Sequence, residues 1–204
     1  TSLSIRDTSA AFDVTIAGNR SGRNGGGIDT ARGTVVLTNV AIVGNAAARS
    51  GGGLLVQNGT LSLTNVTISG NTAALRGGGI SQGPVDATLT NVTIAGNSAS
   101  VGAGIEKGNT GTMSLRNTIV ADNAPGGNCS LPVTSLGGNL DSGATCGLTG
   151  PGDLVNANPL LGPLQNNGGP TDTRALLPGS PAIDAGGSAG CPATDQRGFP
   201  RPED

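Results

Sequence analysis

The stretch Leu63-Thr64-Asn65-Val66-Thr67-Ile68-Ser69-Gly70-Asn71 decides how this chain folds, because it recurs. Close copies lie at 37–45 and 89–97, a shorter copy opens the array at 13–19, and a degenerate copy ends it at 115–123. The last asparagines of the copies recur with a constant period of 26 residues, at Asn19, Asn45, Asn71, Asn97 and Asn123. A fixed period of about 20–50 residues is typical of solenoids, propellers and stacked arrays.

The spacing of apolar residues selects one architecture among these. Residues 60–64 read Thr-Leu-Ser-Leu-Thr, an alternation that predicts a strand with one buried face. No window has the i, i+3, i+4, i+7 spacing of an amphipathic helix, and a propeller blade needs about 40 residues. The period therefore predicts an all-β fold, a right-handed single-stranded parallel β-helix with 26-residue coils.

Stacking of such coils places equivalent residues about 4.8 Å apart along the helix axis. Two apolar interior columns are expected: Leu37, Leu63, Leu89 and Leu115, and Ile16, Ile42, Ile68 and Ile94 with Val120 at its end. Asparagine at a bend tolerates the left-handed region, and stacked asparagines bond to one another. We therefore expect two structural asparagine ladders: Asn19, Asn45, Asn71, Asn97 and Asn123, and Asn39, Asn65, Asn91 and Asn117 with Asp13 in first place.

Glycine clusters form a second repeated signal, which predicts corners that need positive φ or leave no room for a Cβ atom. Each cluster precedes an aliphatic residue, at Ile28, Leu54, Ile80 and Ile105. The last of these clusters comes one residue early, and the stretch 106–113 restores the phase with one extra residue. Loops absorb insertions most easily, so this slip is expected at a corner.

The chain is expected to form one domain with two parts. Residues 1–123 hold the parallel β-helix repeats, preceded at 1–12 by an incomplete coil. Residues 124–204 are rich in glycine and proline and are predicted to form one or two irregular coils and then a cap over the last coil or a strap along one face. An open β-helix end exposes unpaired backbone and needs such cover.

All three cysteines follow the repeats. A disulfide between Cys129 and Cys146 would close a loop of about 15 residues and contribute about 3 kcal/mol. A disulfide favours an extracellular or cell-surface location. Cys191 is then left unpaired or available for an intermolecular bond.

Composition excludes several function classes. The net charge is −2 and charged residues are sparse, so no basic field for nucleic acid exists. No apolar run is long enough to span a membrane. Histidine is absent, which excludes histidine-based triads and zinc chemistry. The sequence predicts no cofactor and no metal site.

The C-terminal region carries a set of short motifs. They are Asn158-Pro159-Leu160-Leu161-Gly162-Pro163-Leu164, Asn167-Gly168-Gly169-Pro170-Thr171, the run 176–186 and Asp195-Gln196-Arg197-Gly198. From about residue 120 to 204 the chain resembles bacterial choice-of-anchor Q surface proteins, some of which carry an N-terminal CSLREA segment that is absent here. The repeats also resemble polymorphic outer-membrane-protein repeats, with Gly-Gly-Gly-Ile and Ile-x-x-Asn as variants. These resemblances imply a secreted or cell-surface β-helix, and they supply no catalytic residue.

An enzyme acting on polysaccharides is an alternative, because many parallel β-helices are lyases or hydrolases. Glycoside hydrolysis needs two carboxylates about 5–10 Å apart. Only Asp29 and Glu106 fall in one expected column, separated by Leu55 and Ser81 and so by about 14 Å. Aromatic sugar platforms are also absent, because the chain has two Phe and no Trp or Tyr. The sequence therefore argues against catalysis.

Two further alternatives concern the surface. The outward positions of the second strand include threonines such as Thr88 and Thr90, a pattern that could order water for ice binding, although Thr is also simply a good strand residue. Five Asn-x-Ser/Thr sequons, at Asn19, Asn58, Asn65, Asn91 and Asn128, are mostly by-products of the repeats, and several should point inward.

We therefore predict a non-catalytic extracellular structural protein, a surface stalk, an adhesin segment or a subunit of a head-to-tail filament. The first coil begins without a capping helix, so its strand edges could pair with another copy and give self-association through terminal coils. The alternative is a β-helix module that binds a surface glycan or protein through its corner loops.

Overall fold

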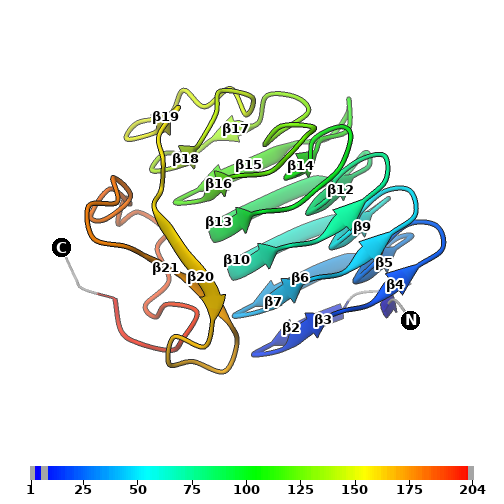
Figure 1. The fold of residues 1–204 in the computed structure, drawn as a ribbon, viewed down its shortest axis with the longest axis horizontal. Helices are drawn as coiled ribbons and strands as arrows, with labels where there is room; N and C mark the ends of the chain where they lie inside the picture. Colours follow the sequence, from blue (N-terminus) through cyan, green and yellow to red (C-terminus); the bar gives the residue numbers. More distant parts are fainter. Residues whose placement is uncertain (1–2, 6–8, 202–204) are drawn as a thin grey trace.

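The computed structural model describes residues 3–5 and 9–201. All helices and strands assigned within these residues are strands, with no helix among them. The strands stack in parallel into a β-solenoid, with the earliest coil at the bottom of Figure 1 and the latest at the top. The predicted all-β parallel β-helix with 26-residue coils is thus confirmed. Within these residues no helix exists that could cross a membrane.

Three parallel sheets form the sides of the solenoid. The first contains β1 (Leu3–Ile5), β5 (Ile28–Thr30), β9 (Leu54–Val56), β12 (Ile80–Gln82) and β14 (Ile105–Glu106). The second is the largest and contains β2 (Ser9–Phe12), β3 (Thr15–Ala17), β6 (Thr34–Thr38), β7 (Ala41–Val43), β10 (Thr60–Ser69), β13 (Asp86–Ala95), β15 (Met113–Arg116), β16 (Ile119–Ala121), β17 (Thr134–Ser135), β18 (Leu140–Asp141) and β19 (Leu154–Val155). The third contains β4 (Arg20–Ser21), β8 (Ala46–Ala47) and β11 (Thr72–Ala73).

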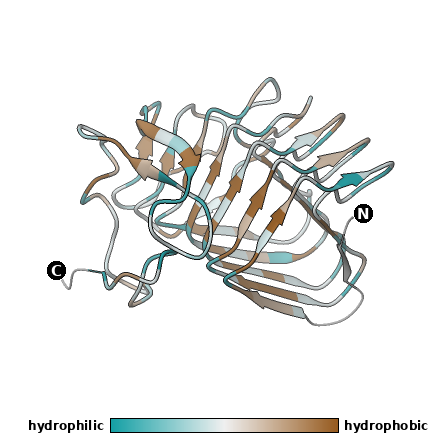
Figure 2. Ribbon diagram, turned by 60° about the horizontal axis from the view of Figure 1, so that its bottom comes forward, coloured by the Kyte–Doolittle hydropathy of each residue, from teal (hydrophilic) through white to brown (hydrophobic). Residues whose placement is uncertain are grey.

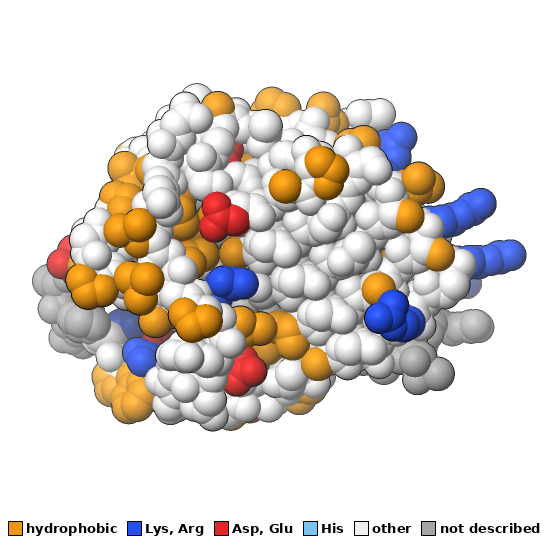
Figure 3. Space-filling model, viewed as in Figure 1, with side chains coloured by type: hydrophobic (Ala, Val, Ile, Leu, Met, Phe, Trp, Pro, Cys, Tyr) orange, Lys and Arg blue, Asp and Glu red, His pale blue; other side chains and the backbone are white. Residues whose placement is uncertain are grey.

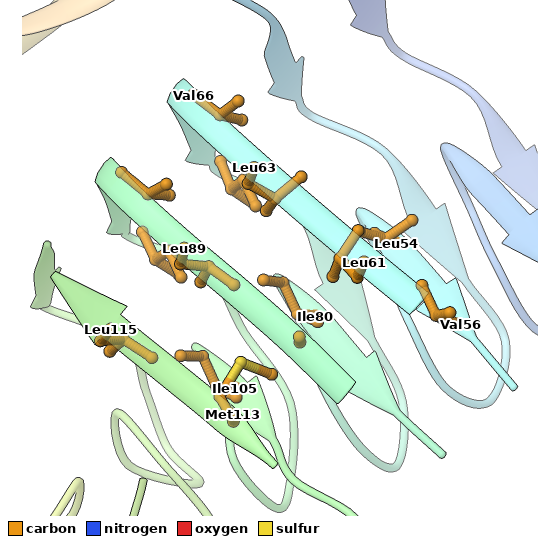
Figure 4. Packing of buried hydrophobic residues seen from close by; sticks show 14 of the residues in the cluster. Leu54, Val56, Leu61, Leu63, Val66, Ile80, Leu89, Ile105, Met113 and Leu115 are labelled. Carbon is orange, nitrogen blue, oxygen red and sulfur yellow. The ribbon is translucent and has the colours of Figure 1, made fainter. Parts of the chain in front are cut away.

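The pairing register follows the sequence period. Leu63 of β10 lies between Leu37 and Leu89, and Leu89 pairs in turn with Leu115. The isoleucine column pairs in the same way from Ile16 to Val120. These side chains point into the solenoid and form one continuous apolar core, part of which is drawn in Figure 4. Both predicted interior columns are therefore confirmed.

Hydropathy divides the ribbon in the same way. The strands of the solenoid carry most of the hydrophobic residues, and many connecting loops are hydrophilic (Figure 2). On the long strand β10 the pattern is an alternation of buried Leu61 and Leu63 with partly exposed Ser62 and Thr64. Because the coil closes around itself, this single inward face suffices to build the core.

The glycine clusters fit the corners for two reasons. The first glycine of each cluster adopts positive φ, with values of 53–69° at Gly25, Gly51, Gly77 and Gly102. The third glycine has no room for a side chain, since a Cβ atom on Gly53 would lie 2.7 Å from the carbonyl oxygen of Gly79 and 3.1 Å from Cγ of Asn71. The two repeated sequence signals thus meet in space, with the glycine column packed against the asparagine column.

The phase slip lies where the sequence predicts it. Ser81 and its neighbour one coil on, Glu106, are 25 residues apart, whereas Asp86 and Thr112 are again 26 apart. The extra residue is accommodated in the connection between β14 and β15.

The C-terminal part divides into two segments of different structure. Residues 124–157 continue the solenoid in shorter coils through β17, β18 and β19. Residues 158–201 leave the stack and run back along its side, beginning with the antiparallel pair β20 (Leu161–Gln165) and β21 (Thr173–Leu176), which is gold at the left of Figure 1. Of the two expected placements, cap or strap, the strap is the one found for this segment. We call residues 158–201 the strap.

Candidate functional site

The inner asparagine ladder is a continuous column of buried amides. Nδ2 of Asn45 donates to Oδ1 of Asn71 at 3.0 Å and to the carbonyl of Ile16 at 2.8 Å. Oδ1 of Asn45 accepts from both Nδ2 and the backbone N–H of Asn19, at 3.1 and 2.9 Å. The same bonds repeat at Asn71, Asn97 and Asn123. The amides of Asn45, Asn71, Asn97 and Asn123 are therefore satisfied in a buried site.

This ladder has a direction, because each amide donates toward the C-terminal end of the stack. The direction continues beyond the repeats, where Asn123 donates to Asn128 at 2.9 Å and Asn128 donates to Oδ1 of Asp141 at 2.6 Å. Asp141 is fully buried and takes the core position next to Val120. Its carboxylate also accepts the N–H groups of Gly143 and Cys146, both at 2.9 Å. An ionised carboxylate only accepts hydrogen bonds, so it ends a column of donors without leaving one unpaired.

A second polar column ends in the same way. Thr118 N–H donates to Oδ1 of Asn139 at 2.9 Å, and the backbone and side-chain N–H groups of Asn139 donate to Oδ1 of Asp153 at 2.9 and 3.1 Å. The second oxygen of Asp153 accepts from Gly150 at 2.6 Å. Neither terminal aspartate could be predicted from the sequence, because the last coils are shorter than 26 residues and the period no longer aligns them.

The predicted disulfide closes the same end of the molecule. Cys129 and Cys146 are bonded, and both side chains are buried. Cys146 is held on one side by the sulfur bridge and on the other by the bond from its N–H to Asp141. Cys191 is free and half-buried, and its Sγ accepts a long contact of 3.6 Å from Nδ2 of Asn91.

The outer asparagine ladder occupies the corner between the two halves of the large sheet. Asp13, Asn39, Asn65, Asn91 and Asn117 all have φ between 48° and 56°. Side-chain hydrogen bonds of 3.0, 3.2 and 3.4 Å join the first four of them. The column is interrupted after Asn91, because Asn117 pairs instead with the backbone of Gly187 in the strap, at 2.8 and 2.9 Å.

The strap is attached to this corner mainly through polar side chains. The buried Gln196 is the centre of the attachment: its Oε1 accepts from Thr67 at 2.8 Å, and its Nε2 donates to Thr171 at 2.9 Å. Arg174 donates from Nε to Oγ of Ser69 at 3.0 Å, and Arg201 donates to Oδ1 of Asn65 at 2.9 Å. The corner ladder therefore serves as the docking edge of the strap.

Asp195 fixes the turn that presents Gln196. Partial burial raises its pKa, but the hydrogen bonds from Arg197 and from the N–H of Phe199, with the Arg197 charge, outweigh burial and hold the pKa below its ordinary 3.8. The Arg197 guanidinium lies 2.6 Å from the Asp195 carboxylate and 4.8 Å from the centroid of the Phe199 ring. The charge of Arg197 is thus neutralised locally.

A groove of about 1150 Å³ lies between the strap and the side of the solenoid. Its floor includes Asn91, Thr93 and Asn117, and its strap wall includes Arg174 and Arg201. In Figure 3 the strap side carries most of the visible hydrophobic side chains together with scattered charged ones, whereas the neighbouring face of the coils is largely uncharged. This groove is a concave surface that a ligand could enter.

The carboxylates of the coils stay dispersed. Asp29, Leu55, Ser81 and Glu106 form one column, as predicted, so two coils separate the acidic residues. Glu106 accepts a bond of 2.8 Å from Ser81 and lies 3.8 Å from Arg76. Within residues 3–5 and 9–201, no three His, Cys, Asp or Glu side chains gather to hold a metal ion.

The first coil is the least covered part of the stack. The β2 residue Phe12 is 60% exposed, and Val14 is 40% exposed. Across the described part of the chain, no hydrogen bond reaches Oδ1 of Asn19, the first acceptor of the inner ladder. Of the five sequon asparagines, Asn65 and Asn128 are buried, Asn19 and Asn91 are half-buried, and Asn58 is exposed.

No protein-family model, no curated protein and no solved structure matches this chain. The resemblance to choice-of-anchor Q surface proteins therefore stays a prediction carried by the motifs of 158–198.

Proposed function

We propose that this protein is a non-catalytic extracellular structural module, a rigid stalk or adhesin segment of a cell surface. The observation that carries the proposal is the unbroken inner ladder, which extends from Asn19 through five rungs to a buried carboxylate and a disulfide. Such a column resists bending and fraying, because each rung after Asn19 is buried and bonded on both sides. Disulfides persist in oxidising compartments, which supports an extracellular location.

The test is a non-reducing peptide map of the protein taken from the medium and the surface of cells that produce it. We expect the protein in these fractions with Cys129 and Cys146 joined and Cys191 free. Recovery from the cytosol with both cysteines reduced would overturn the extracellular role.

Self-association is a separate part of the proposal. At the C-terminal coils the two columns of donors end at Asp141 and Asp153, whereas the N-terminal coil exposes Phe12, and within the described residues no donor reaches Oδ1 of Asn19. We propose that any contact between copies uses the N-terminal coil. A head-to-tail filament would bring the acceptor end of one copy against the carboxylate end of the next, which is a mismatch.

Sedimentation velocity with negative-stain microscopy tests this part. A concentration-dependent dimer that Phe12→Lys abolishes would support contact through the N-terminal coil. Regular fibres with an axial repeat of one subunit would contradict it and favour the filament.

The second candidate function is a binding module for a surface glycan or protein. The observation that favours it is the groove beside the strap, which a purely mechanical stalk does not need.

A further inference from the structure

Two arginines of the strap line the groove without a carboxylate partner. The ion pairs among the described residues are Arg76 with Glu106 and Arg197 with Asp195, so neither Arg174 nor Arg201 is neutralised. Both meet the same stretch of β10, Arg174 at Ser69 and Arg201 at Asn65. Both arginines thus lie over the same coil, at positions four residues apart, with the bond between Thr67 and Gln196 between them.

Arg174 is held in place by part of its guanidinium only. Nε donates to Ser69 at 3.0 Å and Nη1 donates to the carbonyl of Gly162 at 3.1 Å. Nη2 makes no hydrogen bond within residues 9–201 and lies over Gly96, 3.6 Å from where a Cβ atom on that glycine would be. An arginine that is fixed at one edge and free at the other is preorganised for an anionic oxygen.

The floor of the groove offers neutral polar groups at a regular spacing. Asn91 and Thr93 lie on one coil, and Asn117 lies on the next, about 4.8 Å further along the axis. The ladder is interrupted between Asn91 and Asn117, and in the described part of the chain no donor reaches Oδ1 of Asn91. The hydroxyl of Thr93 likewise makes no bond there. These amides and hydroxyls suit a ligand that is rich in hydroxyl groups.

The backbone hydrogen-bonding groups of this floor are already paired within the sheet. β13 pairs with β10 on one side and with β15 and β16 on the other, so no strand edge is open there to a peptide. Recognition by strand addition needs such an edge. The side chains, rather than the backbone, must therefore contact a ligand.

We propose that the groove binds an acidic glycan, a chain of sugars that carry carboxylates. The free edge of Arg174 holds a carboxylate of the chain, Arg201 adds positive charge to the same wall, and Asn91 and Thr93 bond sugar hydroxyls. The chain lies along the solenoid axis, so that successive sugars meet successive coils. This inference rests on the second candidate function, the binding module, and is independent of the structural role.

Isothermal titration with an oligogalacturonate tests the proposal, with the neutral methyl-esterified form of the same oligomer as the matched ligand control. The acidic form should bind, and the neutral form should bind at least about tenfold more weakly, since a bond to a charged group contributes enough for such a factor. Binding of the acidic form should weaken with added salt.

The variants locate the site. Arg174→Gln should weaken binding by about tenfold, and Arg49→Gln, which removes the same charge from an exposed position outside the groove, should leave it unchanged. Because Arg174 also holds the strap, a second variant is needed that leaves the strap contacts intact. Thr93→Glu places a like charge on the floor and should abolish binding, while Thr93→Gln should retain most of it. Thermal unfolding of each variant confirms that it is folded.

Three results would overturn the proposal. An equal loss with Arg49→Gln would mean non-specific attraction and no site. Equal binding of the neutral oligomer, or of polyglutamate, that remains sensitive to Thr93→Glu would remove the acidic glycan as the ligand and leave the binding module standing. No binding of any of these probes would remove both.

Discussion

The regular coils and the last, shorter coils use different residues to satisfy the hydrogen bonds of their polar columns. In the regular coils, each asparagine of the inner ladder both donates and accepts, so one residue type can repeat without limit. In the coils after Asn123, the donors meet Asp141 and Asp153, which only accept. A repeated amide therefore propagates the stack, and a carboxylate ends it.

The difference explains why the two ends of the solenoid are unlike. The C-terminal end is closed by the buried carboxylate of Asp141, the half-buried carboxylate of Asp153 and a disulfide. In the N-terminal coil Phe12 is exposed, and among the residues that the structure describes no donor reaches Oδ1 of Asn19. The inner ladder therefore cannot continue past the carboxylates with the same pattern of donors and acceptors.

The largest expected effect is on a rung inside the regular coils. Asn71→Asp replaces the amide donor with a carboxylate oxygen that faces the carbonyl of Ile42 and Oδ1 of Asn97. The side chain of Asn71 is 0% exposed, so the uncompensated charge should cost about 3–5 kcal/mol of unfolding free energy. Urea unfolding measures the change. A loss below about 1 kcal/mol, the scale of an ordinary hydrogen bond, would show that the ladder contributes little.

The disulfide comes next. Replacing both cysteines, in Cys129→Ala with Cys146→Ala, removes a bridge that spans 17 residues and should cost about 3 kcal/mol. The loss should be concentrated in 124–157, with the regular coils still folded. Circular dichroism and limited proteolysis distinguish local from global loss. Complete unfolding at room temperature would show that the regular coils depend on the last coils for their stability. That result would contradict the division of the solenoid into these two parts.

The reverse substitution at the terminal carboxylate should have a smaller effect. Asp141→Asn keeps the shape of the side chain but turns one acceptor into a donor that faces another donor, and it should cost about 1–3 kcal/mol. Asp122→Asn is the matched control, because Asp122 is exposed and has positive φ, which asparagine tolerates. Unfolding by guanidinium compares the two. Equal stability of both variants would refute the role of the carboxylate as a terminator.

The smallest expected effect is a loosening of the strap turn at acid pH. The pKa of Asp195 lies below 3.8 in the folded protein, so the unfolded state binds this proton first as the pH falls. Its contribution is complete above the unfolded pKa and is lost as the pH drops through the lower folded value. The strap turn should therefore loosen below about pH 4 before the coils do. Hydrogen exchange of the Phe199 amide against pH would detect it, and Asp195→Asn should remove the dependence.

Periodic residues could be predicted from the sequence, and pairs outside the period could not. The columns of Leu63 and Ile68, the asparagine ladders and the slip at Glu106 all follow from a 26-residue repeat. Asp141 lies in the core column of Val120, but no period relates the two. Gln196 bonds Thr67 across 129 residues, a pairing that depends on how the strap folds back. The groove belongs to this second kind, since the strap forms one of its walls.

The comparison between the regular coils and the last, shorter coils is tested most directly by native-state hydrogen exchange of the whole stack with the disulfide intact. The slowest amides should be those of Asn45, Asn71 and Asn97, whose N–H groups bond to the next rung. The Cys146 amide, bonded to Asp141, should be nearly as slow, and the first coil should exchange fastest. Faster exchange at Cys146 than at Asn19 would contradict the claim that the carboxylates close the C-terminal end.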